Sequence, residues 1–429
     1  MSTLTPDAPA PAAPDPALAT ARTRSLKAPI AFGLFTVVAA VLFVALAREG
    51  ESTFRLSTST DFFALPDAVL PSAATGLVLT VLLALLTALA TVRAVRAEKV
   101  PVWLVSVFGV LFLVGFLTWT SAGATIPVPG LLLGALALST PLIFGALGGV
   151  ISERVGVVNV AIEGQLLAGA FVSALVASLT GQAFVGLAAA MLAGVLVSMV
   201  LAVFSIRYIV DQVIVGVVLN VLVTGLTSFL YSQVLSTDPA LNQGIRFPQL
   251  PIPVLSQVPV LGPVFFRQTI IVYLMYVTIA VVFFALFRTR WGLRLRAVGE
   301  HPQAADTVGI KVNATRFWNV SLAGAIAGLG GAYFTLGSLG NFQKEMTAGA
   351  GFIALAAVIF GRWDPIRATL AALLFGFASN LQNVLGAIGS PVPSEFMLML
   401  PYVVTIFAVA GLVGQSRGPA ASGKPYLKS

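Results

Sequence analysis

The sequence has no cysteine and only one histidine, His301, among its 429 residues. Without cysteine, the chain can form no disulfide bond, thiolate metal site or cysteine nucleophile, and one histidine is too few for a histidine-based metal cluster or a catalytic triad. Charged residues are also scarce, at 9%, whereas hydrophobic residues reach 58%. The sequence therefore predicts a membrane protein that is not an enzyme and needs no metal or cofactor.

Basic residues outnumber acidic ones by 24 to 16, which makes the net charge +8. Such a balance could indicate nucleic-acid binding, but the basic residues are scattered among the segments that separate apolar runs. We interpret them as signals of membrane topology. If the chain begins inside the cell, all but five of them fall on the cytoplasmic side together with both termini, which predicts a bacterial inner membrane protein. The five on the outer side are Arg48, Arg55, Arg246, Arg267 and Lys344.

The apolar runs are mostly about 18 to 24 residues long, the length of a membrane-spanning helix. Water is absent from the bilayer core, and the alternating pattern of barrel strands is missing, so helices are the expected structure. We predict an all-α polytopic fold with about 10 to 12 transmembrane helices. The segments are Ile30–Ala47, Val69–Val92, Val102–Trp119, Leu131–Val150, Val155–Leu179, Ala183–Ile206, Gln212–Val234, Ile270–Phe287, Phe317–Gly337, Met346–Phe360, Ala368–Leu385 and Phe396–Val413.

Two parts of the chain depart from this regular pattern. Residues 1–28 are rich in Pro and Ala, lack the features of a signal peptide and are expected to form a disordered cytoplasmic tail. Met346–Phe360 is too short for a regular crossing and contains Gly349, Ala350 and Gly351 in succession. We expect a short or broken crossing buried within protein, the alternatives being a re-entrant loop or a tilted helix that thins the bilayer.

The stretch Ile151–Phe171 places a carboxylate and amides inside an otherwise apolar span. A helix that starts near Val155 would put Glu163 about 12 Å deep, with Asn159 four residues earlier on the same face. An ionisable group at that depth is costly unless it is paired or hydrated, so Glu163 is expected to face the bundle interior. It would either line a solute path or brace the helix through a hydrogen bond with Asn159, and a bracing role would allow Gln to replace it.

Other spans carry amide side chains, which we predict to converge with Glu163 on one translocation path. Polar groups in several spans avoid desolvation only by meeting one another or water. Amides suit a neutral solute rich in hydroxyl and amide groups. The predicted pathway residues are Asn159, Glu163, Gln165, Asn220, Asn380, Gln382 and Asn383.

The charged loop Arg288–Arg316 is expected on the cytoplasmic face. Pro302 suits the first turn of a short helix, Gln303–Val308, that Gly309 would end. A surface helix with small residues favours docking onto a partner protein. The alternative is a loop held at the membrane surface by anionic lipid.

Two further patterns carry less weight. Glycine pairs at Gly130–Gly134, Gly145–Gly149 and Gly324–Gly328 are typical of close helix packing. Gly418–Lys424 matches the start of a phosphate-binding loop, but Pro425 replaces the required Ser or Thr and no strand precedes it. We therefore reject a nucleotide site in this chain.

Three stretches together resemble the permease subunits of bacterial ABC importers, in the simple-sugar and nucleoside branch of the group that includes ribose-type and branched-chain amino-acid permeases. They are ISERVGVVNVAIEGQLLAGAF, GLRLRAVGEHPQAADTVGIKV and GFIALAAVIFGRWDPIRATLAALLFGFASNLQ. The resemblance runs from Leu131 to Val413. It implies a permease core over about 126–415, additional transmembrane helices over 29–125 and a cytoplasmic tail over 416–429.

The resemblance also implies a type II importer fold and a set of partners. These are a second related permease subunit, an ATPase subunit that carries the nucleotide-binding domains, an extracytoplasmic substrate-binding lipoprotein, a small polar solute and membrane lipid. An external ATPase agrees with the missing nucleotide site. The helix that couples to the ATPase would lie in the loop 288–316, with Arg294, Arg296, Gly299, Glu300, Ala304, Ala305 and Gly309 at the contact.

The resemblance favours nucleosides as the solute, with simple sugars and amino acids as alternatives. Two other classes of function remain open. An ion-coupled secondary transporter would usually need several charged relays within its spans, whereas Glu163 is the only clear one. A membrane enzyme would need a convergent acid, base or metal site, for which this composition offers few residues.

Overall fold

The computed structural model describes residues 26–98, 100–389, 392–393, 395–396, 399 and 418–427. Its α-helices are α1 (Lys27–Ala39), α2 (Ser72–Val95), α3 (Val102–Thr120), α4 (Val128–Arg154), α5 (Ile162–Thr180), α6 (Ala183–Ala202), α7 (Gln212–Leu230), α8 (Leu261–Phe265), α9 (Ile270–Arg288), α10 (Arg290–Glu300), α11 (Pro302–Thr307), α12 (Val312–Ala332), α13 (Ala350–Phe360) and α14 (Pro365–Ala387). The π-helical segments η2 (Ala40–Ala45), η3 (Val203–Arg207), η4 (Tyr231–Leu235) and η7 (Tyr333–Leu339) continue α1, α6, α7 and α12.

Within the described residues, strands and 3-10 turns occur only as short pieces between these helices. They are β1 (Glu51–Arg55), β2 (Ala68–Pro71), β3 (Thr125–Pro127), η5 (Pro239–Asn242), β4 (Gln249–Pro251), η6 (Leu255–Gln257) and β5 (Arg267–Thr269). Thr53 to Arg55 of β1 pair in parallel with Thr125 to Pro127 of β3, and β4 pairs with β5 in antiparallel register.

Ten helices of the described part are long and apolar enough to cross a membrane, which confirms the predicted all-α polytopic fold. Their boundaries differ from expectation at one important place. α4 continues to Arg154 and α5 begins only at Ile162, so the expected helix start near Val155 is wrong. The expected segment Phe396–Val413 and the amino-terminal tail lie almost entirely outside the described residues.

The expected break near Gly349–Gly351 is present. α13 has 11 residues and is preceded by Gly349 at φ +82°, a conformation that glycine adopts readily. Upstream of this break, Phe342 and Thr347 are 0% and 3% exposed. The non-helical segment before α13 is thus only partly buried, because Gln343, Lys344, Glu345 and Ala348 are exposed.

The contacts divide the chain into two compact units, of which the first comprises residues up to 52 and residues 70–123. It contains α1, η2, α2 and α3. Its core is aromatic: Phe32 of α1 stacks on Phe108 of α3 with ring centroids 4.1 Å apart, and Phe43 is also buried. A Cβ on Gly76 or Gly115 would come within 3.0 Å of Phe43, so these glycines allow the helices to close around that ring.

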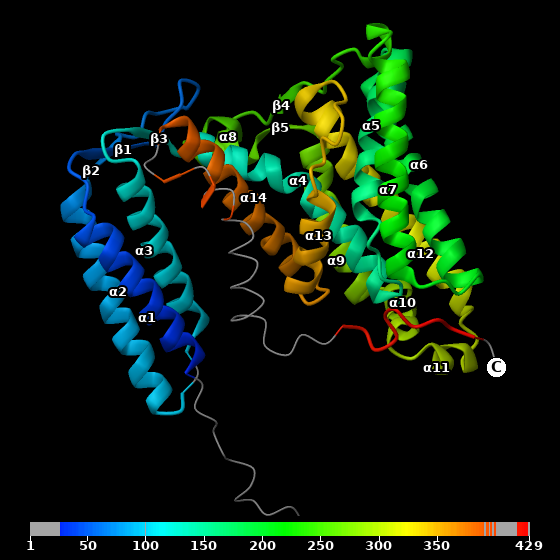
Figure 1. The fold of residues 1–429 in the computed structure, drawn as a ribbon, viewed down its shortest axis with the longest axis horizontal. Helices are drawn as coiled ribbons and strands as arrows, with labels where there is room; N and C mark the ends of the chain where they lie inside the picture. Colours follow the sequence, from blue (N-terminus) through cyan, green and yellow to red (C-terminus); the bar gives the residue numbers. More distant parts are fainter. Residues whose placement is uncertain are drawn as a thin grey trace, which may run out of the picture. The chain divides into compact units, whose positions relative to one another are not determined.

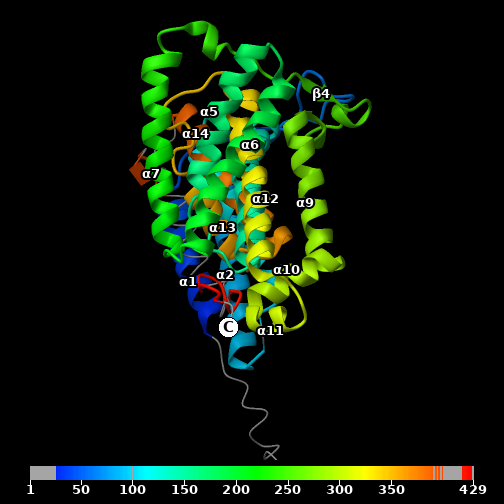
Figure 2. The ribbon, with the colours of Figure 1, turned by 90° about the vertical axis from the view of Figure 1, so that its right-hand side faces the viewer.

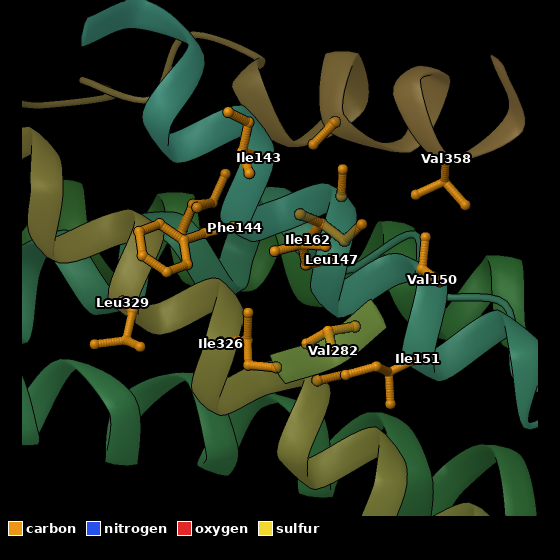
Figure 3. Close-up of a cluster of buried hydrophobic side chains, with 14 of the residues drawn as sticks. Ile143, Phe144, Leu147, Val150, Ile151, Ile162, Val282, Ile326, Leu329 and Val358 are labelled. Carbon is orange, nitrogen blue, oxygen red and sulfur yellow. The ribbon is translucent and has the colours of Figure 1, made fainter. Parts of the chain in front are cut away.

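The second unit comprises residues 53–69 and 124–429 and contains the remaining helices. α12 is its central helix: most residues of its span, Val312–Leu339, are buried, and it packs against α4, α5 and α6 (Figures 1 and 2). Figure 3 shows side chains from α4, α5, α9, α12 and α13 meeting in one apolar core. Among them Phe144, Leu147 and Ile162 are completely buried.

Glycine contacts bring α6 and α12 close together. A Cβ on Gly194 would lie 2.0 Å from the carbonyl oxygen of Gly324, and one on Gly328 would lie 2.2 Å from that of Ala190. Only hydrogen fits at these positions. The sequence pattern at Gly324–Gly328 therefore does mark a helix interface, and that at Gly145–Gly149 marks the contact of α4 with α13 through Ala354 and Val358.

The α6–α12 contact gives a direct test of this packing. Gly194→Ala should lower the free energy of unfolding by about 1–3 kcal/mol, because the added methyl group meets backbone that cannot move aside. The measurement is the unfolding midpoint of the purified protein in detergent. Gly225→Ala is the matched control, since its Cβ would meet no atom within 4 Å. An equal loss of stability in both variants would contradict the assignment.

Candidate functional site

The link between α4 and α5 turns back into the bundle. Gly156, at φ +94°, reverses the chain after α4, and the Ser152 hydroxyl donates to the Val157 carbonyl at 2.8 Å. Cβ atoms on Gly145 and Gly149 would come within 3.0 and 3.2 Å of the Ile162 side chain. Those glycines precede the end of α4 by about 8 to 14 Å of helix. α5 therefore begins well inside the bundle, although no helix covers residues 155–161.

Glu163 lies in the first turn of α5 and is 8% exposed. One oxygen of its carboxylate accepts hydrogen bonds from the Thr347 hydroxyl at 2.6 Å and from the Gly349 N–H at 2.9 Å. The other oxygen accepts from the Gly351 N–H at 2.6 Å. The carboxylate thus caps the amino end of α13, where unpaired N–H groups and the helix dipole favour a negative charge.

The glycines around the α13 break explain how these groups come so close. A Cβ on Gly351 would lie 2.3 Å from the backbone nitrogen of Glu163, so no other residue fits there without a shift. The backbone before α13 is also strained, with Glu345 at φ 54° and Ala348 at φ 45°. The tight path of this segment brings two backbone N–H groups onto one carboxylate.

Asn159 does not pair with Glu163 as the sequence led us to expect. Its side-chain amide exchanges two hydrogen bonds of 3.1 Å with that of Gln165, which also donates to the Ser198 hydroxyl at 2.9 Å. All three side chains are completely buried. The expected shared helix face is absent because Asn159 precedes the start of α5.

α7 satisfies the open backbone groups at the start of α5. Asn220 accepts from the Gly164 N–H and donates to the Val160 carbonyl, both at 2.8 Å. Gln212, at the start of α7, accepts from the Val158 N–H at 2.7 Å. Asn220 therefore binds backbone next to Glu163 at the start of α5, and their predicted place on one translocation path stays a prediction.

The three amides predicted on α14 do not join this network. Asn380 donates to the Leu131 carbonyl at 2.7 Å, near the opposite end of α4 and about 20 Å along the helix from Gly145. Gln382 is half-buried and Asn383 is exposed. The expected convergence with Asn380 is wrong. The way α14 packs along α4 places Asn380 near the start of α4, far from the contacts at Glu163.

The expected helix in the charged loop is present as α11. Pro302 occupies its first turn, and Gly309, at φ +85°, follows its end. The single histidine caps it: His301 Nδ1 accepts from the Ala304 N–H at 3.2 Å. This role accounts for a lone exposed histidine without any catalytic chemistry.

The seven predicted coupling residues divide into two groups. Arg294, Glu300, Ala304 and Gly309 are exposed. Arg296 is half-buried and lies over the Phe287 ring at 5.3 Å, whereas Ala305 is 3% exposed. Gly299 is also buried, and a Cβ there would lie 2.0 Å from the Arg154 carbonyl oxygen. Ala305 and Gly299 therefore pack inside this protein, and α11 offers Ala304 rather than Ala305 to a partner.

The structure also reveals a junction that the sequence did not point to. The Trp363 indole donates to the Glu153 carboxylate at 2.5 Å, and Arg154 Nε donates to the Trp363 carbonyl at 2.9 Å. Trp363 lies between α13 and α14, at φ 55°. The available signal in the sequence was the adjacent charged pair Glu153 and Arg154 at the end of the apolar helix α4. Their partner, Trp363, lies more than 200 residues away in the sequence.

The chain is similar to known proteins over about two thirds of its length. Residues 131–409 match the family described as branched-chain amino acid transport system / permease component. The chain is 41% identical to the guanosine ABC transporter permease protein NupQ of Bacillus subtilis, over 68% of its own length and 95% of that protein. It is 42% identical to the nucleoside ABC transporter permease protein NupC of Lactococcus lactis over the same shares. It is also 37% identical to a putative glucose ABC transporter permease protein, TsgC13 of Haloferax volcanii, over 59% of this chain and 77% of that protein.

The Glu163 cap predicts how much stability each of three variants loses. This differs from the sequence-based expectation that Gln could replace a bracing Glu163 without loss. In Glu163→Gln the amide nitrogen cannot accept a hydrogen bond, so at least one buried donor loses its partner, at a cost of about 1–3 kcal/mol. Glu163→Ala should cost more, because all three donors lose their acceptor. Thr347→Val should cost least, since it removes one donor and leaves the carboxylate two. Unfolding midpoints in detergent measure this order, and a Glu163→Gln variant as stable as the parent would contradict it.

Proposed function

The chain belongs to the family of permease components of branched-chain amino acid transport systems, and on that premise we propose that it imports nucleosides as part of an ATP-driven ABC transporter. As a member it is a multi-pass membrane permease and not an enzyme. The observation that carries the choice of solute is the similarity, at 41% and 42% identity over nearly their whole length, to permeases named for guanosine and nucleoside transport. The glucose permease relative keeps simple sugars as the second candidate.

The chemistry of the interior supports a neutral solute. Asn159 of the α4–α5 link, Gln165 of α5 and Asn220 of α7 all hydrogen-bond around the start of α5. Amides both donate and accept hydrogen bonds, as nucleoside bases and sugar hydroxyls require. The one carboxylate there, Glu163, is already held by three donors. In our proposal these residues brace the path, and opening of the helix ends exposes their amides to solute.

Energy would come from an ATPase subunit that docks on the exposed face of α11. A continuous series of contacts leads inward from there. Gly299 of α10 packs on the Arg154 carbonyl, and Arg154 holds the backbone of Trp363. α13 begins at the Glu163 cap and ends just before Trp363. We infer that movement of α11 shifts α13 as a short rigid helix and so loosens or tightens the helix ends that meet at Glu163.

The remaining partners and the orientation are part of the same proposal. A second, related permease subunit would complete the pathway, and a substrate-binding lipoprotein would deliver solute from outside. Both termini and α11 would face the cytoplasm, as the distribution of basic residues indicates. The first three helices lie before the matched residues 131–409.

The solute assignment is tested by uptake. Vesicles that contain the complete transporter should take up labelled guanosine in the presence of ATP. Unlabelled adenosine or uridine should compete strongly, and ribose, galactose and leucine weakly. Stronger competition by a free sugar than by any nucleoside would transfer the assignment to the sugar branch, and competition by leucine alone would refute both.

The orientation is tested by labelling, for which the absence of cysteine gives a clean background. Gln303→Cys and Thr237→Cys place single thiols at exposed positions that the proposed topology puts on opposite sides. An impermeant thiol reagent added to intact cells should modify the Thr237→Cys variant and spare the Gln303→Cys variant until the membrane is permeabilised. The reverse pattern would invert the topology.

A further inference from the structure

The carboxyl-terminal segment Gly418–Leu427, here called the strap, lies against the same end of the second unit as α10 and α11 (Figures 1 and 2, red). It does not form the strand, loop and helix of a nucleotide site; it is an irregular segment of turns. Ala421 and Tyr426 are only 5% and 8% exposed. An irregular segment buried to this extent is bound to the structure beneath it.

The strap contacts each element of the proposed route from α11 to α13. The Ala421 N–H donates to the Gly299 carbonyl of α10 at 2.9 Å, and the Ala420 N–H donates to the Glu300 carboxylate at 3.2 Å. A Cβ on Gly418 would lie 3.0 Å from the Trp363 ring. The strap therefore spans from the end of α13 to the end of α10.

Tyr426 extends this attachment to α11. Burial and the nearby Asp306 carboxylate of α11 both raise the pKa of its hydroxyl. α11 itself packs on α10 and α12 and buries Pro302 and Ala305. Tyr426, beside Asp306, adds to this attachment.

Arg316 depends on the strap for its hydrogen bonding. Its side chain is 2% exposed, and its Nη1 donates to the Lys424 carbonyl at 2.9 Å. Its Nε and Nη2 are buried and have no partner among the described residues, while Nη2 would lie 2.8 Å from a Cβ on Gly156. Burying a guanidinium with so few hydrogen-bond acceptors costs free energy, so the Lys424 carbonyl of the strap stabilises the buried Arg316. Arg316 and the strap thus hold each other in place between α12 and the α4–α5 link.

We propose that the strap is a positioning element for transport: it clamps α11 to α10, α12 and Trp363, so that movement imposed on α11 reaches α13 instead of being lost in the loop. This inference rests on the proposed function. Without the strap, α11 would remain available to an ATPase but would move independently of the bundle. Loss of the strap should therefore uncouple ATP hydrolysis from transport without preventing assembly.

The first part of the test asks whether the strap is docked in the membrane-embedded protein. Adjacent residues provide a matched pair, because Ala420 is exposed and Ala421 is buried. In detergent or vesicles, the thiol of the Ala421→Cys variant should react about tenfold or more slowly than that of the Ala420→Cys variant. Adding Tyr426→Ala should abolish this difference. Equal rates in the otherwise unaltered protein would overturn the proposal.

The second part measures solute transported per ATP hydrolysed by the assembled complex. Tyr426→Ala should reduce this ratio severalfold or more while the ATPase still co-purifies with the permease. Leu427→Ala is the matched control, since that neighbouring side chain is 68% exposed, and it should leave the ratio unchanged. An unchanged ratio in a Tyr426→Ala variant whose strap has detached would overturn the proposal.

Further variants separate coupling from folding. If Tyr426→Ala fails to accumulate, Tyr426→Phe keeps the buried ring and removes only the hydroxyl. A normal ratio in that variant would also overturn the proposal if the thiol of Ala421→Cys there reacts as fast as that of Ala420→Cys, which shows that the strap has detached. Ala304→Trp, on the exposed face of α11, should instead detach the ATPase. The ratio is measured with whichever solute the uptake assay identifies, so a wrong solute leaves this test intact, whereas uptake without ATP would refute the proposed function itself.

Discussion

The carboxylate of Glu163 at the amino end of α13 is the interaction on which the interior of this protein depends. A bilayer offers no water to backbone groups, so a helix can break within it only where protein supplies the missing partners. Here the first turns of α5 and α13 lie against each other, and protein groups supply hydrogen-bond partners for the open backbone N–H groups of both. Glu163 caps α13 from the first turn of α5, and Asn220 serves the open groups of α5. A charge inside the bundle is tolerated because it replaces water for N–H groups that would otherwise be unpaired.

The opposite end of α13 is held equally firmly, with consequences for movement. Trp363 follows the helix and is bound through its ring by Glu153 and through its backbone by Arg154. An 11-residue helix held at both ends is a short, stiff connection between the loop that follows it and the interior contacts at Glu163. The glycines of α4 and α6 let neighbouring helices approach so closely that displacement of one helix must be followed by the others. A transporter built in this way can transmit movement over a distance without a flexible interior.

Several features could be read from the sequence because their causes are local. Spans follow from runs of apolar residues, α11 from Pro302 and Gly309, and the break before α13 from its glycines. That Glu163 and Asn220 lie inside the bundle could also be expected, since polar groups in apolar spans have few other options. The place of Asn380 could not, because it depends on how α14 packs along α4, which no local pattern encodes.

By itself, then, the sequence determined the class of protein, most of the spans, the position of the surface helix and the kinds of polar group inside. Hydropathy and backbone preferences act over a few residues, so they can be recognised in the sequence. Only the tertiary structure decided what each polar group contacts. Asn159 hydrogen-bonds to Gln165 rather than to Glu163, and the side chain of Ala305 is buried. The Trp363 indole donates to the carboxylate of Glu153, which lies more than 200 residues away in the sequence. These choices depend on which backbone donors and acceptors are left open when helices pack, and that is a property of the assembled bundle rather than of any segment.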